Sequence, residues 1–394
     1  MPKSRSSKLT PKKTGKTRKG ARIPLGREKN APTQEEWDQM PEYGTFQVSD
    51  LDGNPYDFSV NETARILPNG CRVGTDIDLH QYWICKILAI RASTENNVWV
   101  QIQWFYSPQD TADAVPTFNA AHCGKFERIE SNHRDCVSSS VFDGRVSVKH
   151  YDERALDPAP IPDDGYFYRY TLNVTDNSIS PTPTATCSCG TPYSPSDADP
   201  TTLMHFCPRP SCRRYYHSRC ITTKGAPPAA DADRDRGFLL CDPDTGRCLE
   251  LDDVLGSASD PPKKKRRTSR AATPHPMPTV GPAASTLFAA LPPALLDAAA
   301  QPIVRGGAFA AGGVAGNVSA VLAARRLVFD ALSGGASADG WEAHMPDRWE
   351  ALVAVSVSEG GSKNTKSKQN SPSKAKAKAG EVLALQCPEC GGPI

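Results

Sequence analysis

The sequence predicts a mainly β domain followed by a small zinc-stabilised finger with a helical insertion, joined and flanked by long disordered tracts. Three observations predict this: strand-like runs in the first half, closely spaced cysteine and histidine pairs after it, and apolar residues at helical spacing further on. Of 394 residues, 38% are hydrophobic and 7% aromatic, and 35 are proline, with a mean hydropathy of −0.48. Such a chain cannot bury enough apolar surface everywhere to offset the entropy of ordering, so we expect compact domains separated by disorder.

The β domain is predicted over residues 40–175. Its strand-like runs are short, rich in β-branched and aromatic residues, and partly alternate with period two. Turn residues such as the Asn-Gly at 69–70 and the Asp-Gly at 143–144 separate them. The runs are "WICKILAI" (83–90), "VWVQIQWFY" (98–106), "VFDGRVSVKHY" (141–151) and "GYFYRYTL" (165–172).

Four sequence elements in this domain resemble the bromo-adjacent homology (BAH) domain, a chromatin module: "WFYSPQDT" (104–111), "SNHRD" (131–135), "GRVSVKHYDE" (144–153) and "YFYRY" (166–170). The resemblance implies a β-barrel-like fold. Some BAH domains hold a methylated lysine between aromatic rings, whose electron-rich faces attract a quaternary ammonium. The positions that the resemblance implies are Trp83, Trp104 and Tyr106 for the cage, with His133 and Asp135 lining a neighbouring groove. The alternative is that these aromatic residues form only the core of a small β domain.

Three pairs of candidate metal ligands follow the β domain. They are Cys187 and Cys189, Cys207 and Cys212, and His217 and Cys220. Zinc takes four such ligands in tetrahedral geometry, so six ligands are too many for one ion and too few for two. A fourth pair is therefore required.

Two pairs could complete the set. Cys387 and Cys390 have the tight spacing of a zinc knuckle but lie far along the chain, whereas Cys241 and Cys248 lie near but have six residues between them. Because the cost of closing a loop rises only slowly with its length, we favour the distant pair. With no secretory signal in the sequence, we expect thiols and metal ligands in preference to disulfides.

The segment "CSCGTPYSPSDADPTTLMHFCPRPSCRRYYHSRC" (187–220) resembles the plant homeodomain (PHD) finger of plant BAH–PHD histone readers. The resemblance implies that the first and third pairs hold one zinc ion and the second and fourth hold another. It also implies a methyl-lysine pocket of Tyr193, Met204 and Tyr215. The chain departs from the pattern at Leu385, where the family has Trp, and in the CxxxxC spacing of the second pair.

Apolar residues at three- and four-residue spacings predict helices between 285 and 332, the second ending at Gly334. The predicted segments are 1–35 (basic tail), 40–175 (β domain), 185–221 (finger, first three pairs), 222–284 (linker), 285–355 (helical insertion), 356–380 (basic linker) and 381–394 (terminal knuckle).

Charge is strongly segregated along the chain. Residues 1–30 contain eleven Lys and Arg and one acidic residue, a composition that would neutralise DNA phosphates without sequence preference. "PPKKKRRTSR" (261–270) matches a nuclear localisation signal with Lys263, Lys264, Lys265, Arg266 and Arg267 at its centre. No run of eighteen apolar residues occurs, so no membrane helix is expected.

The sequence therefore predicts a nuclear, non-enzymatic chromatin reader that binds histone tails, and DNA through its basic tails, with two structural zinc ions. P-loop, GxSxG and HExxH motifs are absent. The alternative is a scaffold of a chromatin complex, in which the β domain and the helical insertion bind other subunits and no methyl-lysine cage exists. A ubiquitin-ligase-like activity is a third reading, which the BAH resemblance disfavours.

Overall fold

The structure is a computed structural model of the chain, which divides into two compact units: Met1–Asp152 with Ile161–Thr184, and Glu153–Pro160 with Ala185–Ile394. The residues described are 30–49, 53–68, 71, 76–162, 164–183, 185–222, 235–249, 287–307, 309, 313–335, 338–353, 385, 387–390 and 394. The basic tail up to residue 29, the nuclear localisation signal and the linker 356–380 lie outside them.

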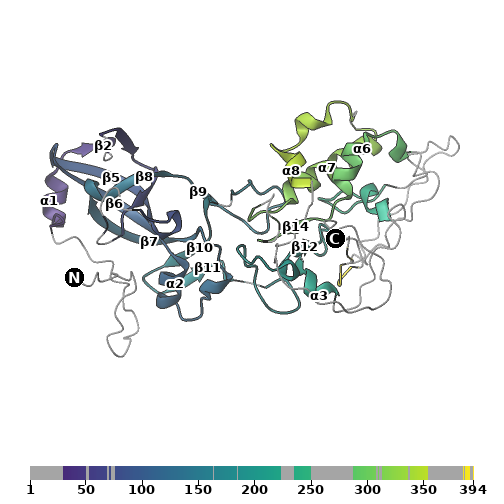
Figure 1. Cartoon of the computed structure of the whole chain (residues 1–394), viewed down its shortest axis with the longest axis horizontal. Coiled ribbons are helices and arrows are strands. Elements are labelled where there is room, and N and C mark those ends of the chain that lie inside the picture. The colour runs from purple at the N-terminus through teal and green to yellow at the C-terminus, as the bar shows by residue number, and fades with distance from the viewer. Residues whose placement is uncertain are drawn as a thin grey trace, which may run out of the picture. The chain divides into compact units, whose positions relative to one another are not determined.

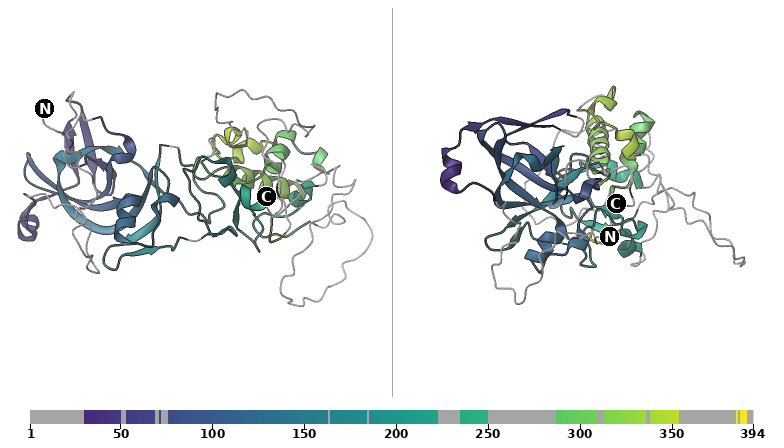
Figure 2. Two further views of the ribbon diagram at one scale, coloured as in Figure 1. Left: turned by 60° about the horizontal axis from the view of Figure 1, so that its bottom comes forward. Right: turned by 60° about the vertical axis from the view of Figure 1, so that its left-hand side comes forward.

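The first unit is built around a mixed sheet, nine-stranded in its described part, with the order β11-β10-β7-β6-β5-β4-β8, where β1 adds to β5 and β9 to β10. Figures 1 and 2 show its strands curving around a common interior. The strands are β1 (Glu42–Tyr43), β4 (Thr63–Ile66), β5 (Trp83–Thr94), β6 (Asn97–Tyr106), β7 (Glu127–Ser138), β8 (Phe142–Val146), β9 (Val148–His150), β10 (Tyr166–Asn173) and β11 (Ser178–Ser180).

Smaller elements complete this unit. Helix α1 (Gln34–Gln39) begins with a capping box, in which Thr33 and Glu36 satisfy each other's backbone N–H groups. Helix α2 (Pro108–Ala114) follows β6, and Ser107 caps its first turn. Strands β2 (Thr45–Ser49) and β3 (Pro55–Ser59) form a separate antiparallel pair. Three short 3-10 turns are η1 (Leu79–Gln81), η2 (Ala120–His122) and η3 (Ser139–Val141).

The four predicted strand runs all fall on strands, but the run 141–151 is split into β8 and β9. The long central strand β7 was not predicted, because "ERIESNHRDCVS" is polar. Its polarity is accommodated by pairing: Arg169 on β10 donates from Nε and Nη2 to the two carboxylate oxygens of Glu127, at 2.8 and 2.9 Å, and both side chains are buried. A bidentate pair of this kind meets the bonding needs of both groups inside the core.

The second unit contains the finger, defined here as residues 185–222 with the terminal residues 385–394. Strands β12 (Met204–Phe206) and β13 (Tyr215–His217) pair antiparallel, and β14 (Val304–Arg305) adds to β12 (Figure 1). The turn η4 (Pro200–Thr202) precedes β12, and helix α3 (Ser218–Thr222) follows β13.

The helical insertion forms a core of its own. It contains α6 (Pro293–Ala300), α7 (Val318–Leu332), η7 (Trp341–His344) and α8 (Trp349–Val353). Their apolar faces pack together, with Leu295, Val328 and Trp341 in the interior. Helix α7 ends as predicted: Gly334 follows with a φ of +78°, the left-handed conformation that glycine adopts without strain.

Two features of the insertion differ from the predictions. Residues 235–249, placed in the linker 222–284, are ordered in part as η5 (Asp235–Leu240), whose Leu239 and Leu240 pack into the helical core. Residues 285–332 are not helical throughout, because β14 separates α6 from α7. The buried Arg325 of α7 donates to the carbonyls of Ala299 and Gln301 at the end of α6, which ties the two helices together.

No helix in the part of the chain described here is both long and apolar enough to cross a bilayer.

Candidate metal centres and aromatic clusters

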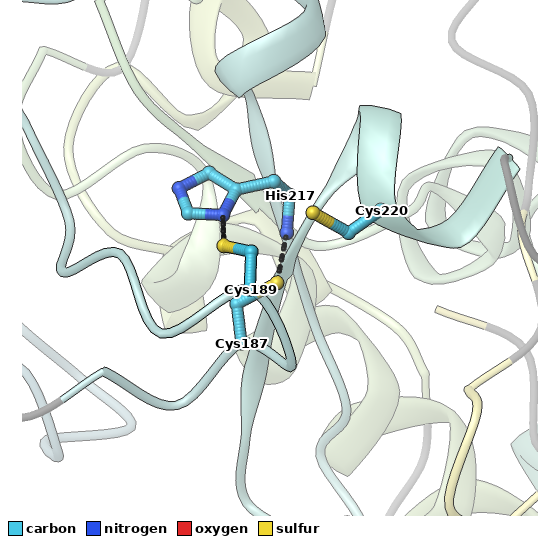
Figure 3. Close-up of side chains that lie close together, drawn as sticks. All are labelled: Cys187, Cys189, His217 and Cys220. Carbon is cyan, nitrogen blue, oxygen red and sulfur yellow. Dashed lines mark hydrogen bonds between the residues drawn. The ribbon is translucent and has the colours of Figure 1, made fainter.

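The first ligand cluster joins the start of the finger to the end of β13. Figure 3 shows the side chains of Cys187, Cys189, His217 and Cys220 gathered close together, with the sulfur of Cys189 beside the His217 ring. Their ligand atoms all lie within 4.8 Å of one another, and the Sγ of Cys189 is 3.4 Å from Nδ1 of His217. His217 is the last residue of β13. Helix α3 begins at the next residue, and Cys220 lies in its first turn, so the two ligands are close together.

The second cluster joins the finger to the end of the chain. It consists of Cys207, Cys212, Cys387 and Cys390, whose Sγ atoms also lie within 4.8 Å of one another. The Sγ of Cys207 is 3.4 Å from that of Cys390, and the Sγ of Cys212 is 3.6 Å from that of Cys387. Leu385 and Ile394, which lie on either side of the two cysteines in the sequence, exchange backbone hydrogen bonds of 3.0 and 2.7 Å.

Both donor sets fit zinc. Zn–S bonds of about 2.3 Å in a tetrahedron place two sulfurs about 3.8 Å apart, close to the separations in the second cluster. The grouping is the one predicted, with the first pair joined to the third and the second to the fourth. Since four side-chain ligands fill the coordination sphere, ions bound here would be structural and would leave no position open for a reacting water.

The pKa values of the clustered thiols are shifted in both directions, lowered at Cys189 and Cys387 and raised at Cys207, Cys212 and Cys220. Burial opposes ionisation of Cys189, but hydrogen bonds from Thr191 lower the pKa of Cys189 to about 7. Hydrogen bonds from Cys207 and then Cys212 lower the pKa of Cys387 to about 6. Several thiols so close together cannot all ionise unless a cation compensates their charge, and zinc binding supplies that charge as the protons leave.

The rival pair is in neither cluster. Cys241 and Cys248 form a disulfide with each other, in the ordered segment after η5. This bond differs from the expectation that the cysteines are thiols or metal ligands. The spacing of the pair, too wide for a zinc knuckle, suits two ends of a short loop.

In the first unit, the predicted cage and groove residues form two separate ring pairs: Trp83 with Trp104, and Tyr106 with His133. Trp83 and Trp104 meet edge to face, with ring centroids 5.5 Å apart. Trp104 is 3% exposed and belongs to the main core, whereas Trp83 is only partly buried. The buried indole N–H of Trp104 meets no hydrogen-bond acceptor within the described part of the chain.

Tyr106 is buried in a second cluster with Phe118 and Tyr170. Its ring stacks on that of His133 at 6.0 Å, and its hydroxyl lies 2.6 Å from Nδ1 of the same histidine. His133 lies within an irregularity of the β6–β7 pairing, where Gln103 pairs with Arg134 but Phe105 pairs with Glu130, and such irregularities redirect side chains. Burial, followed by the charges of Asp110 and Asp135, raises the pKa of Tyr106, so two carboxylates lie near the phenol.

The predicted pocket of the finger is brought together, but a residue that was not predicted fills it. The guanidinium carbon of Arg305 lies 4.0 Å from the ring centroid of Tyr193 and 3.5 Å from that of Tyr215. Its Nη2 is 3.9 Å from the sulfur of Met204 and 2.9 Å from Oε2 of Glu153. One feature of the sequence could have indicated this role for Arg305: it is the single charged residue between Asp297 and Arg325, in an apolar stretch.

The family comparison identifies a domain that falls largely within the first unit. Residues 57–183 match the family model of the BAH domain. The chain is 26% identical over 140 residues to the chromatin remodeling protein EBS of Arabidopsis thaliana, a match that covers 35% of this chain and 55% of that protein. It thus spans about half the length of the curated relative it matches. The crystal structure of the yeast Rsc2 BAH domain is similar at 15% identity, over 36% of this chain and 54% of that one, with a TM-score of 0.25.

Proposed function

We propose that this chain, which contains a BAH domain at residues 57–183, is a nuclear, non-enzymatic chromatin reader whose BAH domain binds a methylated lysine of a histone tail. The observation that carries the proposal is the aromatic surface at Trp83. The partly exposed ring of Trp83 meets Trp104, whose indole N–H lacks an acceptor among the described residues. Because Trp104 is buried and holds the Trp83 ring edge to face, the partly exposed Trp83 is the ring that a methylated lysine would contact.

The charge around the site favours a cation. Asp110 and Asp135 both act on Tyr106, the cage position two residues along β6 from Trp104, and aromatic rings attract a quaternary ammonium that cannot form hydrogen bonds. His133 and Asp135 are both partly exposed, so residues that flank a bound lysine could contact them. The name of the matched relative, a chromatin remodeling protein, supports chromatin as the setting.

The remaining parts have supporting roles in this proposal. Two zinc ions would stabilise the finger. The eleven Lys and Arg of residues 1–30 would add salt-dependent affinity for nucleosomal DNA, and "PPKKKRRTSR" would direct nuclear import. A weak histone contact and a weak DNA contact in one chain raise each other's effective concentration, so together they hold a nucleosome more tightly than either alone.

A test is the affinity of the full chain for histone peptides that differ only in one trimethyl-lysine, measured by fluorescence anisotropy. Trp83→Ala is expected to weaken binding about tenfold, within the range of a cation–π contact. Because Trp83 is partly exposed, this change disturbs the fold less than Trp104→Ala. The matched control is Tyr43→Ala, which removes a 49% exposed ring elsewhere in the first unit and is expected to leave binding unchanged.

A peptide carrying the neutral carbon analogue of trimethyl-lysine tests the electrostatics, since it keeps the shape and loses the charge. The reader proposal predicts that it binds like the unmodified peptide. Undiminished binding of Trp83→Ala to the methylated peptide, or equal binding of all peptides, would contradict the proposal.

The scaffold function is the second candidate, and one observation favours it. The helical insertion has a core separate from the finger, including the packed rings of Trp341 and Trp349. A body of this kind can present a surface to another subunit. Recovery of the same nuclear partners by wild type and Trp83→Ala, together with their loss when residues 338–353, which lie outside β14, are deleted, would support the scaffold.

A further inference from the structure

The finger receives a strand from the chain's own insertion. Met204 pairs with Arg305 and His205 with Val304, so β14 extends the two-stranded sheet of the finger along the free edge of β12. The N–H of Phe206 also donates to the carbonyl of Ile303, at 2.9 Å. Extended peptides bind to sheets by this kind of strand addition, in which main-chain bonds give affinity and side-chain pockets give specificity.

The side chain of Arg305 lies where a bound cation would lie. It is 1% exposed, between the rings of Tyr193 and Tyr215, each 3% exposed. Both rings lie close enough for cation–π attraction, which is strongest where water is excluded. The ion pair with Glu153 adds a charge-assisted hydrogen bond of 2.9 Å.

The chemistry of this pocket suits a guanidinium better than a quaternary ammonium. The guanidinium is flat, so it can stack between two rings, and its N–H groups donate to a carboxylate at the same time. A trimethylated lysine has no N–H and would leave the carboxylate of Glu153 without a donor from the ligand. The pocket therefore combines features that select arginine.

The backbone around Arg305 holds it in place. The side-chain oxygen of Asn317 accepts the N–H of Val304 at 2.7 Å, and its amide nitrogen donates to the carbonyl of Pro302 at 2.9 Å. Gly316 has a φ of +68°, and a Cβ there would lie 1.9 Å from the carbonyl oxygen of Val304. This close approach, and a hydrogen bond from the Tyr193 hydroxyl to the carbonyl of Val314, fix the strand on the finger.

We propose that the aromatic pocket of the finger is an arginine site occupied in cis by Arg305, and that the finger does not take a methyl-lysine from another chain. A tethered and pre-ordered group competes at a high effective concentration, so a free peptide cannot displace it at ordinary concentrations. The pocket then fastens the helical insertion to the finger. This proposal does not rest on the function proposed for the BAH domain.

Chemical rescue tests the proposal in the full-length, zinc-loaded protein labelled with 13C-methyl methionine. The methyl resonance of Met204, assigned by its loss in Met204→Leu, reports on the pocket of the finger and not on Trp83. In Arg305→Ala, methylguanidinium at 5–20 mM, on the order of the effective concentration of a short tether, is expected to shift the Met204 resonance back toward its wild-type position. It should also raise the midpoint of thermal unfolding by about 2–4 °C.

Tetramethylammonium and a trimethyl-lysine peptide are expected to do neither in Arg305→Ala, and to leave the Met204 resonance of the wild type unmoved. The matched control is Arg326→Ala, which removes a more exposed arginine paired with Asp244 in the same insertion and should gain nothing from methylguanidinium.

Three results would overturn the proposal: a saturable shift of Met204 in the wild type on adding the trimethyl-lysine peptide, rescue of Arg305→Ala by tetramethylammonium as good as by methylguanidinium, or no rescue by either cation. If Arg305→Ala does not fold, the wild-type titration alone decides. Resistance of Met204 to the peptide then supports the proposal, and a saturable shift refutes it.

Discussion

The aromatic residues of the BAH domain contact one another, whereas those of the finger contact a guanidinium group. In the first cluster, Trp83 meets Trp104 and keeps part of its ring exposed; in the second, Tyr193 and Tyr215 are buried against Arg305. Both sets were expected from the sequence to form methyl-lysine pockets. The difference teaches that aromatic residues at suitable positions do not identify a ligand, because the chain itself can provide the cation.

The two units also differ in what stabilises them. The BAH domain has an apolar core and a buried ion pair between Glu127 and Arg169. The finger contains two clusters that could hold metal ions, one of which closes with residues 387 and 390, almost at the end of the chain, and we expect zinc bound there to stabilise it. The pocket of Arg305 should therefore fail when metal is removed, and the surface at Trp83 should not.

Metal removal is expected to have the largest effect. Replacing both Cys387 and Cys390 by Ser should lower the zinc content from two ions to one per chain, measured by native mass spectrometry. Binding of a structural zinc contributes about 10–16 kcal/mol in small zinc domains, so loss of one ion should unfold much of the finger. Hydrogen exchange should then accelerate in residues 204–217 but not in residues 83–106.

The control for that experiment is the double replacement of Cys241 and Cys248 by Ser, which should retain both ions. If that variant lost an ion and the terminal variant lost none, the assignment of the fourth ligand pair would be reversed.

Breaking the buried ion pair between Glu127 and Arg169 is expected to destabilise the BAH domain and to leave the finger unaffected. Glu127→Gln leaves the Arg169 guanidinium buried without its carboxylate, a change that typically costs about 3–5 kcal/mol. Denaturant unfolding should show that loss in the BAH domain while the zinc content stays at two. Arg145→Ala is the control: it breaks a pair with Glu62 in which the arginine is 59% exposed, and should cost at most about 1 kcal/mol.

A smaller loss is expected from Asn317→Ala, which removes the two side-chain hydrogen bonds from Asn317 to Val304 and Pro302. Leaving buried backbone groups unpaired costs about 1–3 kcal/mol. Hydrogen exchange of the Val304 amide should accelerate more than that of amides in α7. If the Val304 amide remained as protected as in the wild type, the role given to Asn317 would be wrong.

The smallest effect is expected from Tyr193→Phe, which keeps the ring over Arg305 and removes the hydroxyl bonded to the carbonyl of Val314. A single hydrogen bond contributes about 0.5–1.5 kcal/mol, so the midpoint of unfolding should fall slightly. The Met204 methyl resonance should change little, because the guanidinium remains stacked. Tyr193→Ala should change it strongly, and equal effects of the two substitutions would contradict a cation–π role for the ring.

Local sequence determined much of the BAH domain. Alternating β-branched and aromatic residues predicted β5, β6 and β10, because alternation places the apolar side chains of a strand on one face, which can then be buried. Strand β7 could not be found this way: Glu127 and Arg128 are polar residues that become buried only because distant groups satisfy them. Arg128, for example, donates to the carbonyl of His80.

The ligand clusters show which features local sequence determines and which depend on tertiary structure. Residue type and tight spacing determined which cysteines and histidine could bind zinc, since two ligands of one pair must reach the same ion. Only the tertiary structure decided that Cys387 and Cys390 meet Cys207 and Cys212 while Cys241 bonds to Cys248. The occupant of the aromatic pocket was decided in the same way, because whether Arg305 faces water or two rings depends on how the insertion folds back on the finger. The sequence specified the chemistry each group can perform, and long-range packing selected the partner for each group.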